Sequence, residues 1–209
     1  MNFKSISIPL NLTTGYQNPN DDFFSPVLSV AKKFDVGVGY FSSIWLLDVK
    51  KGIYQFAING GRSRWIISPN INIQDAAAIN QGFSLKSIGS AQKEIEDLVL
   101  DELALMDVDS RTLLSNLIVA GVLDFKISYP ISEGNNLFHA KMGTVIDDDG
   151  NQIAFNGSFN LTGHAKDNWE YIDIYTDETA RERQRILSIQ ERFNTLWAGE
   201  DAFYQVFTP

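Results

Sequence analysis

The chain has 209 residues, 44% of them hydrophobic, which is enough to build the core of one compact domain. It contains no cysteine, so disulfides, thiol chemistry and cysteine-ligated metal sites are excluded. Its 17 basic and 26 acidic residues give a net charge of −9. This charge argues against a broad basic face for non-specific DNA binding, but it allows a local positive cleft.

The apolar runs are short and far from the ~20 residues that a membrane-spanning helix needs. The N-terminal residues lack the apolar core of a signal peptide. We therefore expect a soluble, cytoplasmic protein that does not engage a membrane.

The first third of the chain predicts a strand, a helix and a second strand that form a parallel crossover unit. Glycines between apolar residues indicate a buried strand, and Asn59-Gly60-Gly61 ends the following helix. The expected elements are a partial strand at Phe3–Leu10, a short helix at Ser25–Phe34, a strand at Val36–Phe41, a helix from Ser42 or Ser43 to about Ile58, and a strand at Arg64–Ser68.

The middle third predicts helices, and the final third predicts strands closed by an amphipathic helix. The expected helices are Ile73–Asn80, Ser90–Met106, Ser110–Ala120 and Ala180–Trp197, and the expected strands are Leu123–Tyr129, Phe138–Ile146, Gln152–Asn156 and Tyr171–Tyr175. In the last helix, the side chains expected to face inward are Ile186, Leu187, Ile189, Phe193, Leu196 and Trp197. The acidic run at Asp147–Asn151 predicts a hairpin turn rather than a calcium loop, because it lacks the late glutamate of such loops.

These elements predict an α/β fold with a mixed, mostly parallel β-sheet flanked by helices. We expect residues 1–209 to form a single domain. The tail at residues 199–209 keeps several aromatic residues, so it either docks on this domain or leads into a further one.

One set of polar residues indicates a catalytic site. His139 and Lys141 lie two residues apart, so on a strand both side chains would face the same side of the sheet. A turn downstream supplies Ser158 and Asn160, and Glu170 adds a carboxylate. An imidazole and an ammonium met by a hydroxyl and an amide make a pocket suited to a phosphate diester.

This set resembles the signature of the phospholipase D-like phosphodiesterase superfamily, which is H-x-K followed by G-S-x-N. The resemblance spans residues 137–175 and is greatest to members found in nucleases, restriction enzymes and helicase-linked proteins. Glu170 stands where family members carry a glutamate that hydrogen-bonds the catalytic histidine. One position departs from the pattern, because Ile146 holds the place of a family aspartate and Asp147 follows it.

The resemblance implies a phospholipase D-like fold with one motif per chain, and therefore a homodimer that shares an active site at its two-fold axis. His139 of one subunit would attack phosphorus, and the same residue of the other would protonate the leaving group. Lys141, Ser158 and Asn160 would stabilise the developing charge, and Glu170 would orient the imidazole. No metal or cofactor is implied.

Other residues carry open alternatives. Ser42 and Ser43 follow a strand and begin a helix, where they either bind a substrate phosphate or cap the helix. His164 repeats the His-Ala-Lys triplet without a following G-S-x-N, so it is either a loop residue near the site or a substrate contact. Arg64 and Trp65, with Arg62, would bind and stack nucleic acid, unless Trp65 belongs to the core.

The predicted function is a metal-independent phosphodiesterase acting on DNA, with RNA as an alternative substrate. We expect an endonuclease of a prokaryotic restriction or defence system, or the nuclease-like domain of a helicase-linked protein, with a helicase or restriction-system partner. The alternative is a non-hydrolytic module that binds nucleic acid or protein within a larger helicase-linked protein.

Overall fold

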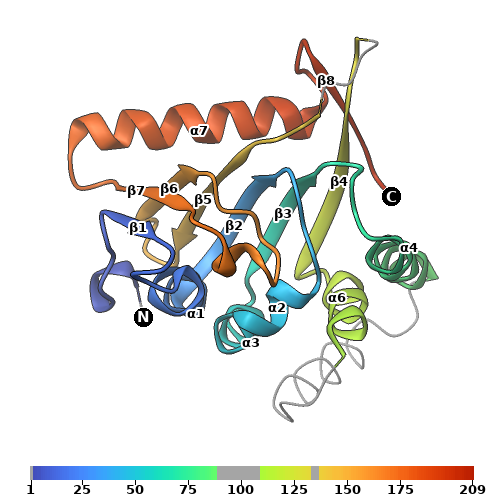
Figure 1. Ribbon diagram of the computed structural model, residues 1–209, viewed down its shortest axis with the longest axis horizontal. Helices are drawn as coiled ribbons and strands as arrows, with labels where there is room; N and C mark the ends of the chain where they lie inside the picture. Colours follow the sequence, from blue (N-terminus) through green and yellow to red (C-terminus); the bar gives the residue numbers. More distant parts are fainter. Residues whose placement is uncertain (1, 89–108, 133–136) are drawn as a thin grey trace.

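The computed structural model describes residues 2–88, 109–132 and 137–209, and these residues form an eight-stranded sheet with helices on both faces (Figure 1). The strand order is β1-β7-β6-β5-β2-β3-β4-β8. The strands are β1 (Asn11–Thr13), β2 (Ala31–Val38), β3 (Arg62–Ile67), β4 (Leu123–Pro130), β5 (Lys141–Asp147), β6 (Gln152–Gly157), β7 (Tyr171–Thr176) and β8 (Tyr204–Phe207).

The α-helices are α1 (Ser25–Val30), α2 (Ile44–Asp48), α3 (Lys50–Ile58), α4 (Ile73–Ile88), α6 (Ser110–Val119) and α7 (Ala180–Ala198). Shorter helical turns occupy Phe3–Ser5, Asn20–Phe24 and Ala165–Asp167. The helix predicted at Ser90–Met106 lies outside the described residues. No helix of the described part combines the length and the apolar character needed to cross a membrane.

The predicted crossover unit is confirmed. β2, β3 and β4 pair in parallel, and α2 and α3 connect the first two of them. The predicted helix at Ser25–Phe34 is too long, because β2 already begins at Ala31 and pairs with strands on both sides. The hydrogen bonds that β2 forms with a strand on each side outweigh the helical pattern of the residues that follow α1. The strand predicted at Phe3–Leu10 is wrong, since a short helical turn stands at Phe3–Ser5 and β1 begins later.

The prediction of a mostly parallel sheet is also wrong. Within the described sheet, the parallel pairs are β2–β3 and β3–β4, and the remaining neighbours are antiparallel. The short β5–β6 connection requires an antiparallel pair, since a parallel pair needs a crossover of a dozen or more residues. The β1–β7, β2–β5 and β4–β8 pairs join segments far apart in the sequence. The predicted hairpin turn between β5 and β6 is confirmed. There the Asp147 carboxylate accepts hydrogen bonds from the backbone of Asp149 at 3.0 Å and of Asn151 at 2.9 Å.

Helix α7 covers one face of the sheet, and α1, α2, α3, α4 and α6 lie on the other side (Figure 1). Phe193 and Leu196 of α7 are buried as predicted, but Leu187 is 53% exposed, so its predicted inward position is wrong. On the other side, Trp65 is completely buried, which confirms the core interpretation and leaves no ring surface for a nucleobase. The tail docks on the sheet, where β8 pairs antiparallel with β4.

Arg64 joins three elements of the fold. Its guanidinium forms two hydrogen bonds to the Asp35 carboxylate on β2, at 2.8 and 2.6 Å, and these raise the pKa of Arg64. Its Cζ lies 5.1 Å from the ring centre of Phe193 and 5.4 Å from that of Trp197 on α7. The side chain that the sequence offered as a nucleic-acid contact therefore ties the central strands to α7.

Gly143 provides a test of the packing between β5 and its two neighbours. A Cβ there would stand 2.6 Å from the Phe155 ring and 2.8 Å from the Asp35 carbonyl oxygen. We expect Gly143→Ala to lower the free energy of unfolding by about 1–3 kcal/mol, as overpacking does. Urea denaturation measures this change, with Met142→Leu as a volume-conserving control on the same strand. A loss no larger than that of the control would contradict this packing.

Candidate active site

Strand pairing brings the five predicted catalytic residues to one edge of the sheet. Val38, the last residue of β2, pairs with Lys141, the first residue of β5. The end of β6 lies beside both the start of β5 and the start of β7, through the pairs Met142–Asn156 and Gly157–Ile172. His139, Lys141, Ser158, Asn160 and Glu170 lie on these strand ends or just beyond them.

His139 and Lys141 differ in their exposure to solvent. β5 begins at Lys141, so His139 precedes the strand, and it is exposed. Lys141 is only 8% exposed, and its Nζ donates a hydrogen bond of 3.0 Å to the carbonyl oxygen of His139. Burial lowers the pKa of Lys141, and the nearby negative charge of Glu170 acts in the opposite direction.

The turn after β6 presents Ser158 and Asn160 with their oxygens already engaged. Ser158 Oγ accepts a hydrogen bond of 3.0 Å from the backbone N–H of Tyr171, and Asn160 Oδ1 accepts one of 3.2 Å from that of Tyr40. The hydroxyl hydrogen and the amide N–H₂ therefore remain as donors. Gly157 allows this approach, because a Cβ there would overlap the carbonyl oxygen of Tyr171. Both side chains are suited to bind an anion at the sheet edge.

Glu170 is fixed by its backbone. Its N–H donates to Thr14 Oγ1 at 2.7 Å, and its carbonyl oxygen accepts from the Thr14 N–H at 3.1 Å. Within one chain, the described contacts of Glu170 include no hydrogen bond to His139. Its carboxylate instead acts electrostatically on Lys141.

Tyr40 is a site residue that the sequence analysis did not single out. Its ring meets the imidazole of His139 edge to face, with 5.7 Å between ring centres. Lys141 Nζ lies 6.0 Å from the centre of the same ring. A tyrosine just after a buried strand gives no pattern by which this contact could have been found.

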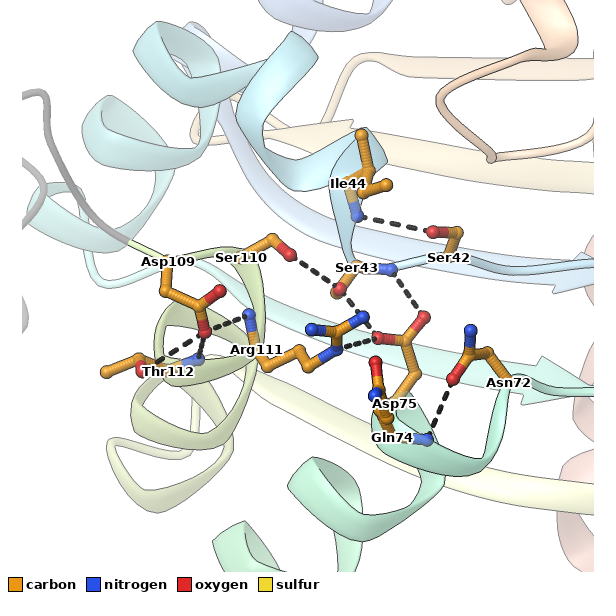
Figure 2. A network of polar contacts seen from close by, with 10 residues as sticks. All are labelled: Ser42, Ser43, Ile44, Asn72, Gln74, Asp75, Asp109, Ser110, Arg111 and Thr112. Atoms are coloured by element: carbon orange, nitrogen blue, oxygen red, sulfur yellow. Dashed lines mark hydrogen bonds and ion pairs between the residues drawn. The ribbon is translucent and has the colours of Figure 1, made fainter.

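Ser43 belongs to a buried network of polar contacts with Asp75, Ser110 and Arg111, which Figure 2 shows. Ser43 is 1% exposed, and its Oγ donates to Asp75 Oδ1 at 2.7 Å while its N–H donates to Oδ2 at 3.1 Å. Ser110 Oγ lies 2.8 Å from Ser43 Oγ, and Arg111 Nε lies 3.4 Å from Asp75 Oδ1. Ser43 therefore stands at the N-cap position of α2, but its side chain makes no capping hydrogen bond and is instead buried against Asp75.

Ser42 forms a marginal local contact instead, because its Oγ accepts from the Ile44 N–H at 3.4 Å. His164 is a loop residue, as one of the two alternatives expected. Its side chain is 91% exposed, and its Nδ1 lies 3.4 Å from Asp167. No group of three or more His, Asp or Glu side chains in the described part of the chain is arranged to hold a metal ion.

Comparison with solved structures supports the fold. NucT from Helicobacter pylori superposes with a TM-score of 0.54 at 15% identity, over 90% of this chain and 94% of that protein. The chain has a phospholipase D-like fold. Nuc from Salmonella typhimurium, described as a phospholipase D family member, is also similar, with a TM-score of 0.49 at 14% identity over 88% of this chain and 92% of that one. No protein-family model and no curated protein matches the sequence.

The lysine of this candidate site provides a pKa test. Burial favours the neutral form of Lys141, so this lysine loses its proton at a lower pH than an exposed lysine does. Glu170→Gln removes the charge that favours the protonated form, so we expect the pKa of Lys141 to fall further. NMR titration of the lysine Cε resonance measures both values. An unchanged titration midpoint in the Glu170→Gln protein would contradict the electrostatic coupling.

The buried serine gives a second test. Ser43→Ala removes a hydrogen bond to a carboxylate, so we expect it to lower the free energy of unfolding by about 1.5–3 kcal/mol. Its neighbour Ser42 provides the matched control, since Ser42→Ala is expected to change stability by less than about 0.5 kcal/mol. Chemical denaturation of both variants measures the difference. Equal stability of the two variants would show that the network of Figure 2 does not stabilise the fold.

Proposed function

We propose that this protein is a phosphodiesterase that hydrolyses nucleic acid through His139. The observation that carries this proposal is the meeting of His139, Lys141, Ser158 and Asn160 at one sheet edge. An exposed imidazole lies there two residues from a buried ammonium, and the neighbouring strand end carries a hydroxyl and an amide whose hydrogens have no acceptor among the described contacts. This combination provides a nucleophile together with donors for the non-bridging oxygens of a diester.

In the proposed mechanism, an imidazole nitrogen of His139 attacks phosphorus and the bond to the leaving oxygen breaks, which leaves a covalent phosphohistidine. Being neutral, the imidazole is not repelled by the anionic diester. The leaving oxygen takes a proton from a second histidine, which then removes a proton from the water that hydrolyses the intermediate. Lys141, Ser158 and Asn160 stabilise the charge on phosphorus in both steps.

The second histidine is proposed to be His139 of a second subunit in a two-fold symmetric homodimer. The chain has two histidines, and His164 is almost fully exposed and paired with Asp167. A two-fold axis next to the site would place two copies of His139 on opposite sides of one phosphate. Glu170, which makes no hydrogen bond to His139 within the described chain, would then be available to the shared site as a whole.

The proposed substrate, biological setting and partner follow from the sequence resemblance. We propose DNA as the substrate and a prokaryotic restriction or defence system as the setting, with a helicase or restriction-system protein as partner. The phospholipase D-like fold is compatible with this role, and the motif is most similar to that of nuclease members.

Cleavage of DNA in excess EDTA tests the mechanism. We expect wild type to cleave, and we expect His139→Ala to reduce the rate by more than about a hundredfold, because one residue supplies both the nucleophile and the general acid. His164→Ala is the matched control, and it should retain activity. A gel assay with end-labelled DNA measures all three proteins. Equal activity of wild type and His139→Ala would overturn the mechanism, and inactivity of both with a dimer in solution would favour a binding module.

A further inference from the structure

Three aromatic side chains that are exposed to solvent lie on segments of the candidate active site or on a turn bonded to one of them. Tyr16 is 87% exposed, Trp169 is 74% exposed and Tyr40 is 38% exposed. We call these three residues the aromatic rim. Isolated exposed apolar residues are common on protein surfaces, but several large aromatic rings beside one polar site are typical of a binding surface.

The outer part of the rim is held by ordered backbone. Thr14 exchanges backbone and side-chain hydrogen bonds with Glu170, and its Oγ1 also donates to the carbonyl oxygen of Asn168. Tyr16 follows Thr14 in a tight turn, where its N–H donates to Thr13 at 3.3 Å and Gly15 has a φ of +88°. Trp169 lies between the two residues that Thr14 binds. The turn that carries Tyr16 is thus fixed beside the segment that carries Trp169.

The rim is continuous with the chemistry of the site. Trp169 is the chain neighbour of Glu170, whose charge acts on Lys141. The ring of Tyr40 contacts the imidazole of His139 edge to face, and the ammonium of Lys141 lies over the same ring. Tyr40 therefore lies next to a phosphate bound at His139, and Trp169 stands beside Glu170 of the same site.

The charge around the rim decides what kind of group it suits. The protein carries a net charge of −9, and Asp167 and Glu170 lie on either side of Trp169 in the sequence. Lys166, the nearest lysine along the chain, is paired with Asp48 at 3.1 Å. Attraction of a phosphate backbone is weak on such a surface, whereas stacking of a nucleobase on an aromatic ring needs no net charge. In a duplex the bases stack on one another, so unpaired bases are the ones free to stack on a protein.

We propose that the aromatic rim is a stacking site for the unpaired bases of single-stranded nucleic acid, next to the phosphodiester that His139 attacks. This inference rests on the proposed function, which it deepens by naming the group that the site recognises. The rim selects base-bearing, unpaired strands over other phosphodiesters.

Binding of labelled oligonucleotides tests the proposal without any cleavage. All proteins carry His139→Ala, and fluorescence anisotropy compares a single strand, an abasic strand of equal length and a duplex. We expect the single strand to bind at least about tenfold more tightly than the abasic strand, in line with stacking on exposed rings. Adding Tyr16→Ala and Trp169→Ala should remove at least about tenfold of the affinity for the base-bearing strand and leave the abasic strand almost unchanged.

Two controls address the fold and the choice of residue. Trp169→Phe keeps an aromatic ring and should retain most of the affinity. Phe203→Ala removes a side chain that is also 74% exposed but lies beside β8, at the opposite end of the sheet, so it should have no effect. Of the four tryptophans, Trp45 and Trp65 are completely buried and Trp197 stacks on Phe193 of α7. Bound bases should therefore quench the fluorescence of Trp169, and Trp169→Phe should lose this quenching.

The outcomes separate the rim from the catalytic proposal. The stacking site would be overturned if the Tyr16→Ala, Trp169→Ala protein lost affinity equally for the base-bearing and abasic strands. It would also be overturned if this protein lost no affinity for either strand. Conversion of a dimer to a monomer by these substitutions, measured by light scattering, would also overturn it and assign the rings to a subunit interface. Base-selective binding together with an inactive wild type would retain the rim and reject the phosphodiesterase.

Discussion

The antiparallel pairing of β2 with β5 is the constraint on which the rest of the site depends. It sets Val38 opposite Lys141, so the end of a strand in the crossover unit meets the start of a strand in the hairpin unit. Gly37 and Gly39 make this approach feasible. A Cβ on Gly37 would lie 3.2 Å from the Phe138 ring, and one on Gly39 would lie 3.0 Å from the Cα and the ring of His139. Side chains at either position would press against the segment that carries the histidine.

The same pairing explains why a lysine is buried at this edge. Lys141 is the first residue of β5, so neighbouring strands cover the aliphatic part of its side chain. Its Nζ donates a hydrogen bond back to the carbonyl oxygen of His139. Burial opposes the charged form of the ammonium, and Glu170 compensates only in part. A bound phosphate diester would bring the negative charge that this lysine lacks in the free protein. Such a lysine at a strand end is consistent with the proposed phosphate-binding role.

The local parts of the structure could be predicted from the sequence, and the non-local parts could not. The hairpin turn at Asp147 and the crossover from β2 to β3 depend on residues close in the chain, and both predictions are confirmed. The mostly parallel sheet was wrong because the β2–β5 pairing joins segments about a hundred residues apart, which no periodicity reveals. Ser43 was misassigned for a similar reason, since its partners Asp75 and Ser110 lie 32 and 67 residues away.

The candidate site itself divides in the same way. The set from His139 to Glu170 was proposed from a motif resemblance, and its members lie on or just beyond consecutive strands of the final third, which the sheet brings to one edge. Tyr40 and Tyr16 come from the first third of the chain, and only pairing across the sheet places them near that edge. The β1–β7 and β2–β5 pairings thus join segments from the two ends of the sequence. Under the proposed function, these pairings would bring together the polar donors for a phosphate and the aromatic rings that flank it. If the proposals hold, this acidic protein would bind a polyanion through one buried lysine and uncharged contacts, because base stacking and hydrogen-bond donors do not depend on net charge.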